Sequence, residues 1–476
     1  MSATPPAPVS SKPEINPVQA PKRNVLERVG AWFMGENGAE PSASGTELRA
    51  WKRDLEACAK EQGGPVASRT RALGLIGLYQ SMDQATRLEA LRAFAVLLKP
   101  DAGPLARTYA DYTASLNTPD EWKMEQALRE AIASPRGKVI RQIGAVQAGV
   151  RFLVDLRAEV FEHMKAAPEL KVLDAELAEQ LGAWFEVGFL ELRRLGWDTP
   201  ANILEKLMAY EAVHEIHSWA DLKNRLDRDR RVYAYFHPRL KDEPLVFVEV
   251  ALTESIAGNV QALLDVSAPL FDTKRARAAM FYSISSTQVG LRGISFGNFL
   301  LKRVVEDLKR DFPKLAHFAT LSPIPGFATW LKGAQVPAEL AQALAVVNAS
   351  TDWARDADAT HRLRGALTAL VAYYLVNVKE GRGADPHRPR DAVARFHLGN
   401  GARLERIHWL ADSSVKGLKQ SYGLMVNYYY DLDDIEGNLA AFDREGTVAA
   451  SGRVRRLADL GAKMLEGKQV SVPVDG

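Results

Sequence analysis

The spacing of the apolar residues changes near Trp197, and this change constrains the fold more than any other feature. Before it, apolar residues recur every three or four positions, the period of an amphipathic helix. Several such runs between about Glu47 and Leu195, with few strand signals, predict a helical bundle. The clearest run predicts one helix over 139–164, whose apolar face comprises Val139, Ile143, Val146, Val150, Leu153, Leu156, Val160 and Met164.

Beyond Trp197 the sequence alternates between strand and helix signals. The runs LVFVEVAL at 245–252 and AAMFYSISS at 278–286 predict two strands. Apolar residues spaced by four over 296–312 predict a helix that Pro313 ends. A third strand is predicted at 317–321, ending at Ser322. Strand, glycine-rich turn, helix and strand in this order describe a βαβ-like unit.

The remaining segments complete the predicted architecture. Helical spacing returns over 337–378, and 396–430 mixes apolar runs with a Gly-Asn-Gly turn at 399–401. We therefore predict an α+β chain in which an N-terminal all-helical bundle precedes a mixed α/β domain. A chain of 476 residues is too long for one ordinary core, and we place the two domains at 46–195 and 196–470.

Residues 1–45 form a separate segment by composition. Six prolines fall within the first 21 positions, among scattered Ser, Ala and Gly, which predicts a disordered arm. A transit peptide is the alternative interpretation, but Glu14 and Glu27 interrupt the segment and its arginines are few.

Charge and cysteine content exclude several classes of protein. A net charge of +2 gives no reason to expect a nucleic-acid partner. The single cysteine, Cys58, allows no intrachain disulfide and fits a reducing compartment. No apolar run reaches the roughly 18 residues that a membrane helix needs, and no apolar signal core is found near the N-terminus. We expect a cytoplasmic protein with no membrane partner.

The turn LRGISFGN at 291–298 is a candidate anion site. Its glycines allow a ligand to approach the backbone, and the free N–H groups of a helix start favour a negative charge. It lacks the Lys-Ser/Thr of a Walker loop and the spacing of a dinucleotide fingerprint. It resembles the pyrophosphate turn of GNAT acetyltransferases, Arg/Gln-x-x-Gly-x-Gly/Ala: Arg292 and Gly297 fit, whereas Ser295 replaces the first glycine. A turn that binds nothing is the alternative.

Serine and histidine residues of the second half offer acid–base chemistry. Ser322 precedes Pro323 and Pro325, which would hold its hydroxyl rigidly at a strand end. A serine and a histidine can form a nucleophile–base pair, although no Gly-x-Ser-x-Gly elbow is found. The other candidates are Ser283, Ser285, His397, His408 and the tyrosines at 428–430. Each histidine can equally be structural, and the tyrosines can form an aromatic edge of the core instead of entering the cleft.

No metal or cofactor motif accompanies these residues. His214 and His217 are spaced i, i+3, unlike the His-Glu-x-x-His of zinc proteases, and we predict no metal site. Biotin and pyridoxal attachment motifs are not found either.

Longer strings then identify a family. The chain resembles malonyl-CoA decarboxylases over roughly 50–435. The strings that carry the resemblance are AGVRFLVDLRAEV (148–160), YEAVHEIHSWADLKNRL (210–226), FYSISSTQVGLRGISFGNFLLKRVVEDLKRDFP (281–313), TLSPIPGF (320–327), ARFHLGNGA (394–402) and SYGLMVNY (421–428).

This resemblance implies a fold, a reaction and a set of site residues. It implies a helical N-terminal domain that builds a homotetramer, a catalytic domain related to the GNAT fold, and conversion of malonyl-CoA to acetyl-CoA and CO2. The implied catalytic residues are Ser322, His397, Ser283 and Tyr430. Animal members carry a glutamate at the position of Ser295. The implied substrate-binding residues are Arg292, Gly293, Ser295, Gly297 and Asn298.

The chemistry agrees with the absence of cofactor motifs. Loss of CO2 leaves an electron pair that the thioester carbonyl accepts as an enolate, so neither an organic cofactor nor a metal is expected. The site must then supply an oxyanion donor, a hold on the carboxylate and a proton. His397 is the best proton-handling candidate and Ser322 the best fixed hydroxyl. An acyl-CoA acyltransferase and a non-catalytic acyl-CoA-binding scaffold are the alternative functions.

Overall fold

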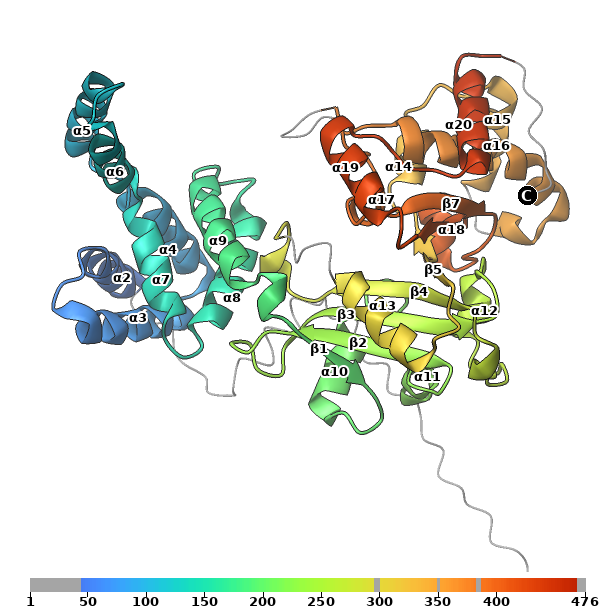
Figure 1. Ribbon diagram of the computed structural model, residues 1–476, viewed down its shortest axis with the longest axis horizontal. Coiled ribbons are helices and arrows are strands. Elements are labelled where there is room, and N and C mark those ends of the chain that lie inside the picture. The colour runs from blue at the N-terminus through green and yellow to red at the C-terminus, as the bar shows by residue number, and fades with distance from the viewer. Residues whose placement is uncertain (1–43, 295–299, 349–351, 382–386, 469–476) are drawn as a thin grey trace, which may run out of the picture. The chain divides into compact units, whose positions relative to one another are not determined.

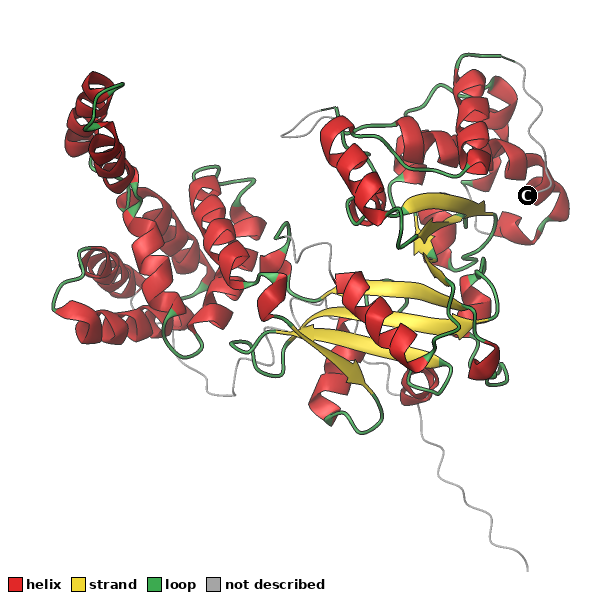
Figure 2. Ribbon diagram, viewed as in Figure 1, coloured by secondary structure: helices red, strands yellow, loops and turns green. Residues whose placement is uncertain are grey.

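The computed structural model describes residues 44–294, 300–348, 352–381 and 387–468 (Figures 1 and 2). The predicted N-terminal arm lies outside these residues up to position 43, and the first described helix begins at Ser44. As predicted, a helical region comes first among the described residues. Its helices are α2 (Ser44–Ala59), α3 (Gly64–Ser81), α4 (Gln84–Leu97), α5 (Ala102–Ser115), α6 (Glu121–Ile132), α7 (Pro135–Gly144), α8 (Gly149–His163) and α9 (Leu170–Trp184).

The single helix predicted over 139–164 is wrong, because the segment forms α7 and α8 with a break between them. Ala148 adopts a left-handed φ of 59°, which ends the helical path. Gly149 then approaches α7 so closely that a Cβ atom there would lie 1.8 Å from the carbonyl oxygen of Ile143. The apolar spacing continues through the break because both helices pack on one core, so periodicity alone gives no sign of it.

A mixed sheet follows the helical region (Figure 2). Its strand order is β1-β2-β3-β4-β5-β8-β6, with β7 paired to β8. The first strand occupies a segment that we expected to be helical, and it pairs antiparallel with β2. The strands are β1 (Glu191–Leu195), β2 (Arg230–Phe236), β3 (Pro244–Thr253), β4 (Ala278–Ser286), β5 (His317–Thr320), β6 (Ser322–Pro323), β7 (Arg403–His408) and β8 (Met425–Tyr429).

The predicted βαβ-like unit is confirmed. β4 has the predicted bounds and pairs parallel with β5, and α13 (Leu300–Asp311) connects them. α13 lies across one face of the sheet, where Asp307 accepts a hydrogen bond from the Tyr233 hydroxyl of β2 at 2.9 Å (Figure 1). Its apolar face is the one that the spacing of four predicted, since Leu300, Val304 and Leu308 are buried.

The third predicted strand differs in one respect that matters for the site. β5 ends at Thr320, and Ser322 begins a separate short strand, β6, that pairs antiparallel with β8. Ser322 is therefore held by backbone pairing to Val426 as well as by the prolines that follow it.

The remaining helices lie between and after the strands of the sheet. None of the helices in the described ranges is long and apolar enough to cross a membrane. The helices are α10 (Ala201–Tyr210), α11 (Trp219–Arg225), α12 (Val260–Leu264), α14 (Phe327–Leu331), α15 (Ala338–Val347), α16 (Ala357–Asn377), α17 (Ala392–Leu398), α18 (Val415–Ser421), α19 (Ile435–Glu445) and α20 (Gly452–Leu465), with 3-10 turns η1 (Val187–Phe189), η2 (Thr273–Arg275), η3 (Val289–Leu291) and η4 (Asp352–Arg355).

Candidate active site

Three side chains from separate elements form a hydrogen-bonded relay. Ser322 begins β6, His397 lies on α17, and Tyr430 directly follows β8. The Nε2 atom of His397 lies 3.1 Å from Ser322 Oγ, and its Nδ1 atom lies 2.8 Å from the Tyr430 hydroxyl. All three side chains are buried. The structure thus brings together three of the four residues that we predicted to be catalytic.

The hydrogen bond between Ser322 and Thr320 decides which atoms of the relay donate and which accept. The Ser322 hydroxyl donates to Thr320 Oγ1 at 2.8 Å, so Ser322 Oγ accepts from the Nε2–H of His397. Nδ1 of His397 then accepts from the Tyr430 hydroxyl, which assigns the tautomer through the network. In this arrangement the proton of Ser322 points away from the imidazole. His397 therefore does not activate Ser322 as a nucleophile in this arrangement.

Burial sets the protonation state of the relay. Desolvation lowers the pKa of His397 to about 3, and its ring stacks on Tyr428 at 4.4 Å between centroids. Desolvation also raises the pKa of Tyr430 well above its ordinary value. Both groups are therefore neutral near pH 7, because a buried site disfavours the charged form. The relay carries hydrogen bonds and mobile protons without a permanent charge.

A buried carboxylate fixes the helix that bears His397. Asp391 caps α17, accepting the backbone N–H groups of Val393 and Ala394 at 3.0 Å each. Its other oxygen accepts the N–H of Gly326, 3.3 Å away, so one side chain links α17 to the loop after Ser322. Gly326 has to be a glycine here, because a Cβ atom would lie 2.2 Å from the Tyr374 hydroxyl. Asp391 thus ties the segment of Ser322 to the helix that bears His397, although the two are far apart in the sequence.

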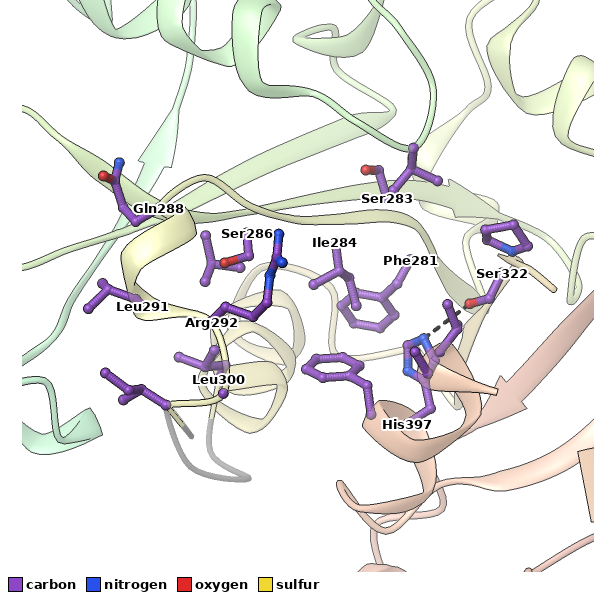
Figure 3. A pocket seen from close by; sticks show the side chains of 18 of the residues that line it. Phe281, Ser283, Ile284, Ser286, Gln288, Leu291, Arg292, Leu300, Ser322 and His397 are labelled. Atoms are coloured by element: carbon purple, nitrogen blue, oxygen red, sulfur yellow. Dashed lines mark hydrogen bonds between the residues drawn. The ribbon is translucent and has the colours of Figure 1, made fainter. Parts of the chain in front are cut away.

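The relay stands at one end of a pocket of about 520 Å³ (Figure 3). Ser322 and His397 lie together on one side, and Gln288, Leu291 and Arg292 lie on the other. Most of the intervening wall is apolar, including Phe281 of β4. Among the described residues that line the pocket, Arg292 is the one with a permanent charge. The pocket therefore suits a long, mainly apolar molecule with an anionic group away from the reacting end.

Ser283, the fourth predicted catalytic residue, lines the same pocket but does not join the relay. Its hydroxyl donates to the buried Glu211 carboxylate at 2.7 and 2.8 Å, and Ser285 donates to the same carboxylate at 2.9 Å. The register between β3 and β4 shifts next to Ser283, which is a β-bulge. Because of this bulge, Ser283 points to the opposite side of β4 from Phe281, although residues two apart in a regular strand share a face (Figure 3). Ser283 is thereby placed to hold the wall of the pocket.

The predicted substrate-binding turn is described only in part. Arg292 and Gly293 follow η3 at the pocket, and Gly293 has a left-handed φ of 79°, which favours glycine. Arg292 is exposed, and its guanidinium lies 5.9 Å from the ring of Phe161. Ser295, Gly297 and Asn298 lie outside the described residues. The described binding residues of the turn, Arg292 and Gly293, both line the pocket.

The other polar candidates are engaged elsewhere. His408 Nε2 pairs with Asn427 Oδ1 at 2.5 Å, and His214 is half-buried, with a pKa that desolvation lowers to about 4. In the parts of the chain that the structure describes, no three His, Cys, Asp or Glu side chains are grouped so that they could hold a metal ion. Cys58 is free and buried.

Sequence interpretation missed three residues that organise the site. Thr320, Glu211 and Asp391 accept hydrogen bonds from Ser322, from Ser283 and from the start of α17, respectively. Thr320 and Asp391 left signals, because residues i and i+2 of a strand share a face and an aspartate before a helical run is a common N-cap. Glu211 lies in one of the strings shared with the family, but no pattern indicates its partner.

The fold and the site define an enzyme in which a helical region precedes a mixed α/β domain, with a neutral Ser–His–Tyr relay at the end of a pocket. Family models named malonyl-CoA decarboxylase N-terminal domain and C-terminal domain match residues 98–185 and 188–470. The chain therefore belongs to the malonyl-CoA decarboxylase family, whose members are carboxy-lyases.

Relatives and solved structures support this assignment. The chain is 37% identical over 364 residues to the mitochondrial malonyl-CoA decarboxylase of Mus musculus, covering 70% of this chain and 73% of the relative. A crystal structure of malonyl-CoA decarboxylase from Rhodopseudomonas palustris matches with a TM-score of 0.79 and 40% identity, over 87% of this chain and all of that one. The corresponding structure from Agrobacterium vitis matches with a TM-score of 0.78 and 40% identity, over 86% and 99%.

Proposed function

We propose that this chain converts malonyl-CoA to acetyl-CoA and CO2 without an organic cofactor or metal. The observation that carries the proposal is the neutral relay of Ser322, His397 and Tyr430 at one end of a pocket that has Arg292 at the other. The malonyl group would lie at the relay, and an anionic part of coenzyme A would lie near Arg292.

The relay can supply what an enolate pathway requires. The bond between the α-carbon and the carboxylate breaks, CO2 leaves, and the electron pair moves into the thioester carbonyl to form an enolate. Donors that are already oriented stabilise the oxygen on which this charge develops. When the substrate is bound, the Ser322 hydroxyl turns its proton from Thr320 Oγ1 to the malonyl carboxylate or to the thioester oxygen. The low pKa of His397 suits the step, because an uncharged donor keeps its proton until the basic enolate forms.

The proton for the α-carbon is proposed to come through His397. As the Nε2–H is transferred to carbon, Nδ1 can take the proton of the Tyr430 hydroxyl, 2.8 Å away. After the product leaves, Nε2 takes a proton from solvent while Nδ1 returns its proton to the tyrosinate of Tyr430, which restores the starting tautomer. The imidazole therefore never has to be a buried cation.

One assay tests the proposal against its alternatives. The full chain is incubated with malonyl-CoA alone, and acetyl-CoA and CO2 are both measured, with and without EDTA. Equal formation of the two products in either buffer supports the proposal. Turnover only after an amine acceptor is added would favour an acyltransferase, and binding without turnover would favour a scaffold. Loss of activity in EDTA would contradict a metal-free mechanism.

The imidazole of His397 should remain neutral from about pH 8 to about pH 5. Its NMR signal in protein with ¹³C-labelled histidine, assigned by its loss in His397→Gln, should not titrate in this range. Because the folded-state pKa of about 3 lies below the ordinary histidine pKa of about 6.5, the neutral imidazole contributes stability that is present above pH 6.5 and lost as the pH falls towards 3. A midpoint near 6.5 would contradict the neutral relay.

Arg292→Ala should raise the KM for malonyl-CoA by about 10- to 100-fold, because a charge-assisted hydrogen bond to a phosphate is lost. The value of kcat should change little, since Arg292 lies across the pocket from the relay. Arg292→Lys, which keeps the charge, is the matched control and should recover part of the loss. An unchanged KM in Arg292→Ala would place the coenzyme elsewhere.

We also propose that the helical region builds a homotetramer. Large apolar side chains on α5 and α6 support this, because Tyr109, Trp122 and Ile132 are 59%, 61% and 58% exposed. Light scattering of the full chain should give about four times the 52.4 kDa of one chain. A mass of one or two chains would contradict the tetramer.

A further inference from the structure

One arginine of the helical region reaches the turn that forms the far wall of the pocket. Arg157 lies on α8, and its Nη1 donates to the carbonyl oxygens of Gly290 at 2.8 Å and Arg292 at 3.1 Å. The side chain is 4% exposed, and its Nε donates to Asp174 of α9 at 2.7 Å. A buried guanidinium is thus fixed on one side by a carboxylate and bonded on the other to two carbonyls of the pocket wall.

The backbone of α8 itself also contacts this turn. A Cβ atom at Gly290 would lie 1.8 Å from the carbonyl oxygen of Val154, so the glycine permits direct contact between η3 and α8. The ring of Phe161 lies 4.8 Å from the Arg157 guanidinium and 5.9 Å from that of Arg292. The backbone carbonyl of Arg292 is therefore held by Arg157, and its side chain lies near Phe161, both on α8.

We infer that Arg157 is a positioning residue for the substrate, holding η3 and Arg292 where they receive the coenzyme A part of malonyl-CoA. The inference rests on the proposed function and extends it, because it gives the helical region a part in binding substrate as well as in assembly. Arg157 does not touch the relay. Its loss displaces the binding wall and leaves Ser322, His397 and Tyr430 in place.

The expected signature is a change in KM without a matching change in kcat. Arg157→Met keeps much of the buried length of the side chain but removes its donors. It should raise the KM for malonyl-CoA about tenfold or more and leave kcat within about twofold. Arg157→Lys keeps the charge beside Asp174 but cannot reproduce the planar fork, and it should give an intermediate KM.

The helical region offers a matched control. Arg136 on α7 is also a buried arginine: it bonds Glu176 at 2.8 Å through Nε and the carbonyl of Ala95 at 2.7 Å through Nη1. These contacts all lie within the helical region. Arg136→Met therefore loses a comparable ion pair without loosening the pocket wall. It should lower the melting temperature as Arg157→Met does and leave KM unchanged.

A second variant tests the contact without removing a buried charge. Gly290→Ala forces η3 away from the Val154 carbonyl and should also raise KM, with kcat retained. It stays informative if Arg157→Met does not fold. An unchanged KM in Gly290→Ala and Arg157→Lys, or an equal rise in Arg136→Met, would overturn the inference.

A binding measurement separates this inference from the proposed reaction. Calorimetry with coenzyme A itself should give a Kd about tenfold higher for Arg157→Met than for the wild type and Arg136→Met. This result would support the positioning role even if the wild type did not decarboxylate malonyl-CoA. Turnover by the wild type together with equal coenzyme A affinity in all three proteins would support the reaction and overturn the role of Arg157.

Discussion

His397→Ala should lower the kcat for malonyl-CoA decarboxylation by about 10²–10³-fold or more, while the protein stays folded. The substitution removes the Nε2–H that faces Ser322 and the Nδ1 atom that accepts from Tyr430, so both steps of the relay are lost. The rate of acetyl-CoA formation at saturating substrate measures the effect, and thermal melting checks the fold. The KM should change less, because we propose that the coenzyme binds at the other end of the pocket.

Two further variants sharpen this result. His397→Gln offers a side-chain N–H near the position of Nε2 but cannot pass a proton between two ring nitrogens, and it should be nearly as slow as the alanine variant. Recovery of activity in His397→Gln would mean that His397 acts as a hydrogen-bond donor only. The exposed His317, whose Nδ1 pairs with the Tyr429 hydroxyl at 3.0 Å, provides the control: His317→Ala should retain the wild-type kcat. Turnover close to that of the wild type in His397→Ala would remove this residue from the mechanism.

Periodicity was a reliable guide to the elements around the site. β4 has the predicted bounds, and the apolar spacing of four correctly identified the buried face of α13. These predictions rest on local patterns, in which one side of a strand or helix faces the core. The break between α7 and α8 depends on a close contact of Gly149 with a carbonyl six residues earlier, and periodicity does not register such contacts.

The sequence offered Ser322 and His397 as separate candidates, but only the resemblance brought them together in one site. Ser322 and His397 are 75 residues apart, and no spacing rule brings such residues together. Asp391 left the local signal of a helix N-cap, but its second contact, with Gly326, could not be predicted, because the two residues are 65 apart in the sequence.

The helical region also makes a contact that local sequence patterns could not predict. Its apolar spacing predicted a helical bundle and gave no sign of a contact with the pocket wall, yet Arg157 reaches the carbonyl of Gly290, 133 residues further along the chain. In the sequence, Arg157 is one of several arginines beside the stripe, and its burial depends entirely on tertiary packing.

Ser322→Ala should also lower kcat by about 10²–10³-fold, with the fold retained, because one oriented hydroxyl donor to the developing charge is lost. Backbone pairing of Ser322 with Val426 survives the substitution, so the position of His397 should not change. Ser421 is the matched control: it is also buried and donates to the Leu424 carbonyl at 2.7 Å, so Ser421→Ala loses a comparable bond without opening the pocket and should keep wild-type turnover. Turnover within about tenfold of the wild type in Ser322→Ala would show that Nε2–H of His397 stabilises the enolate without the serine.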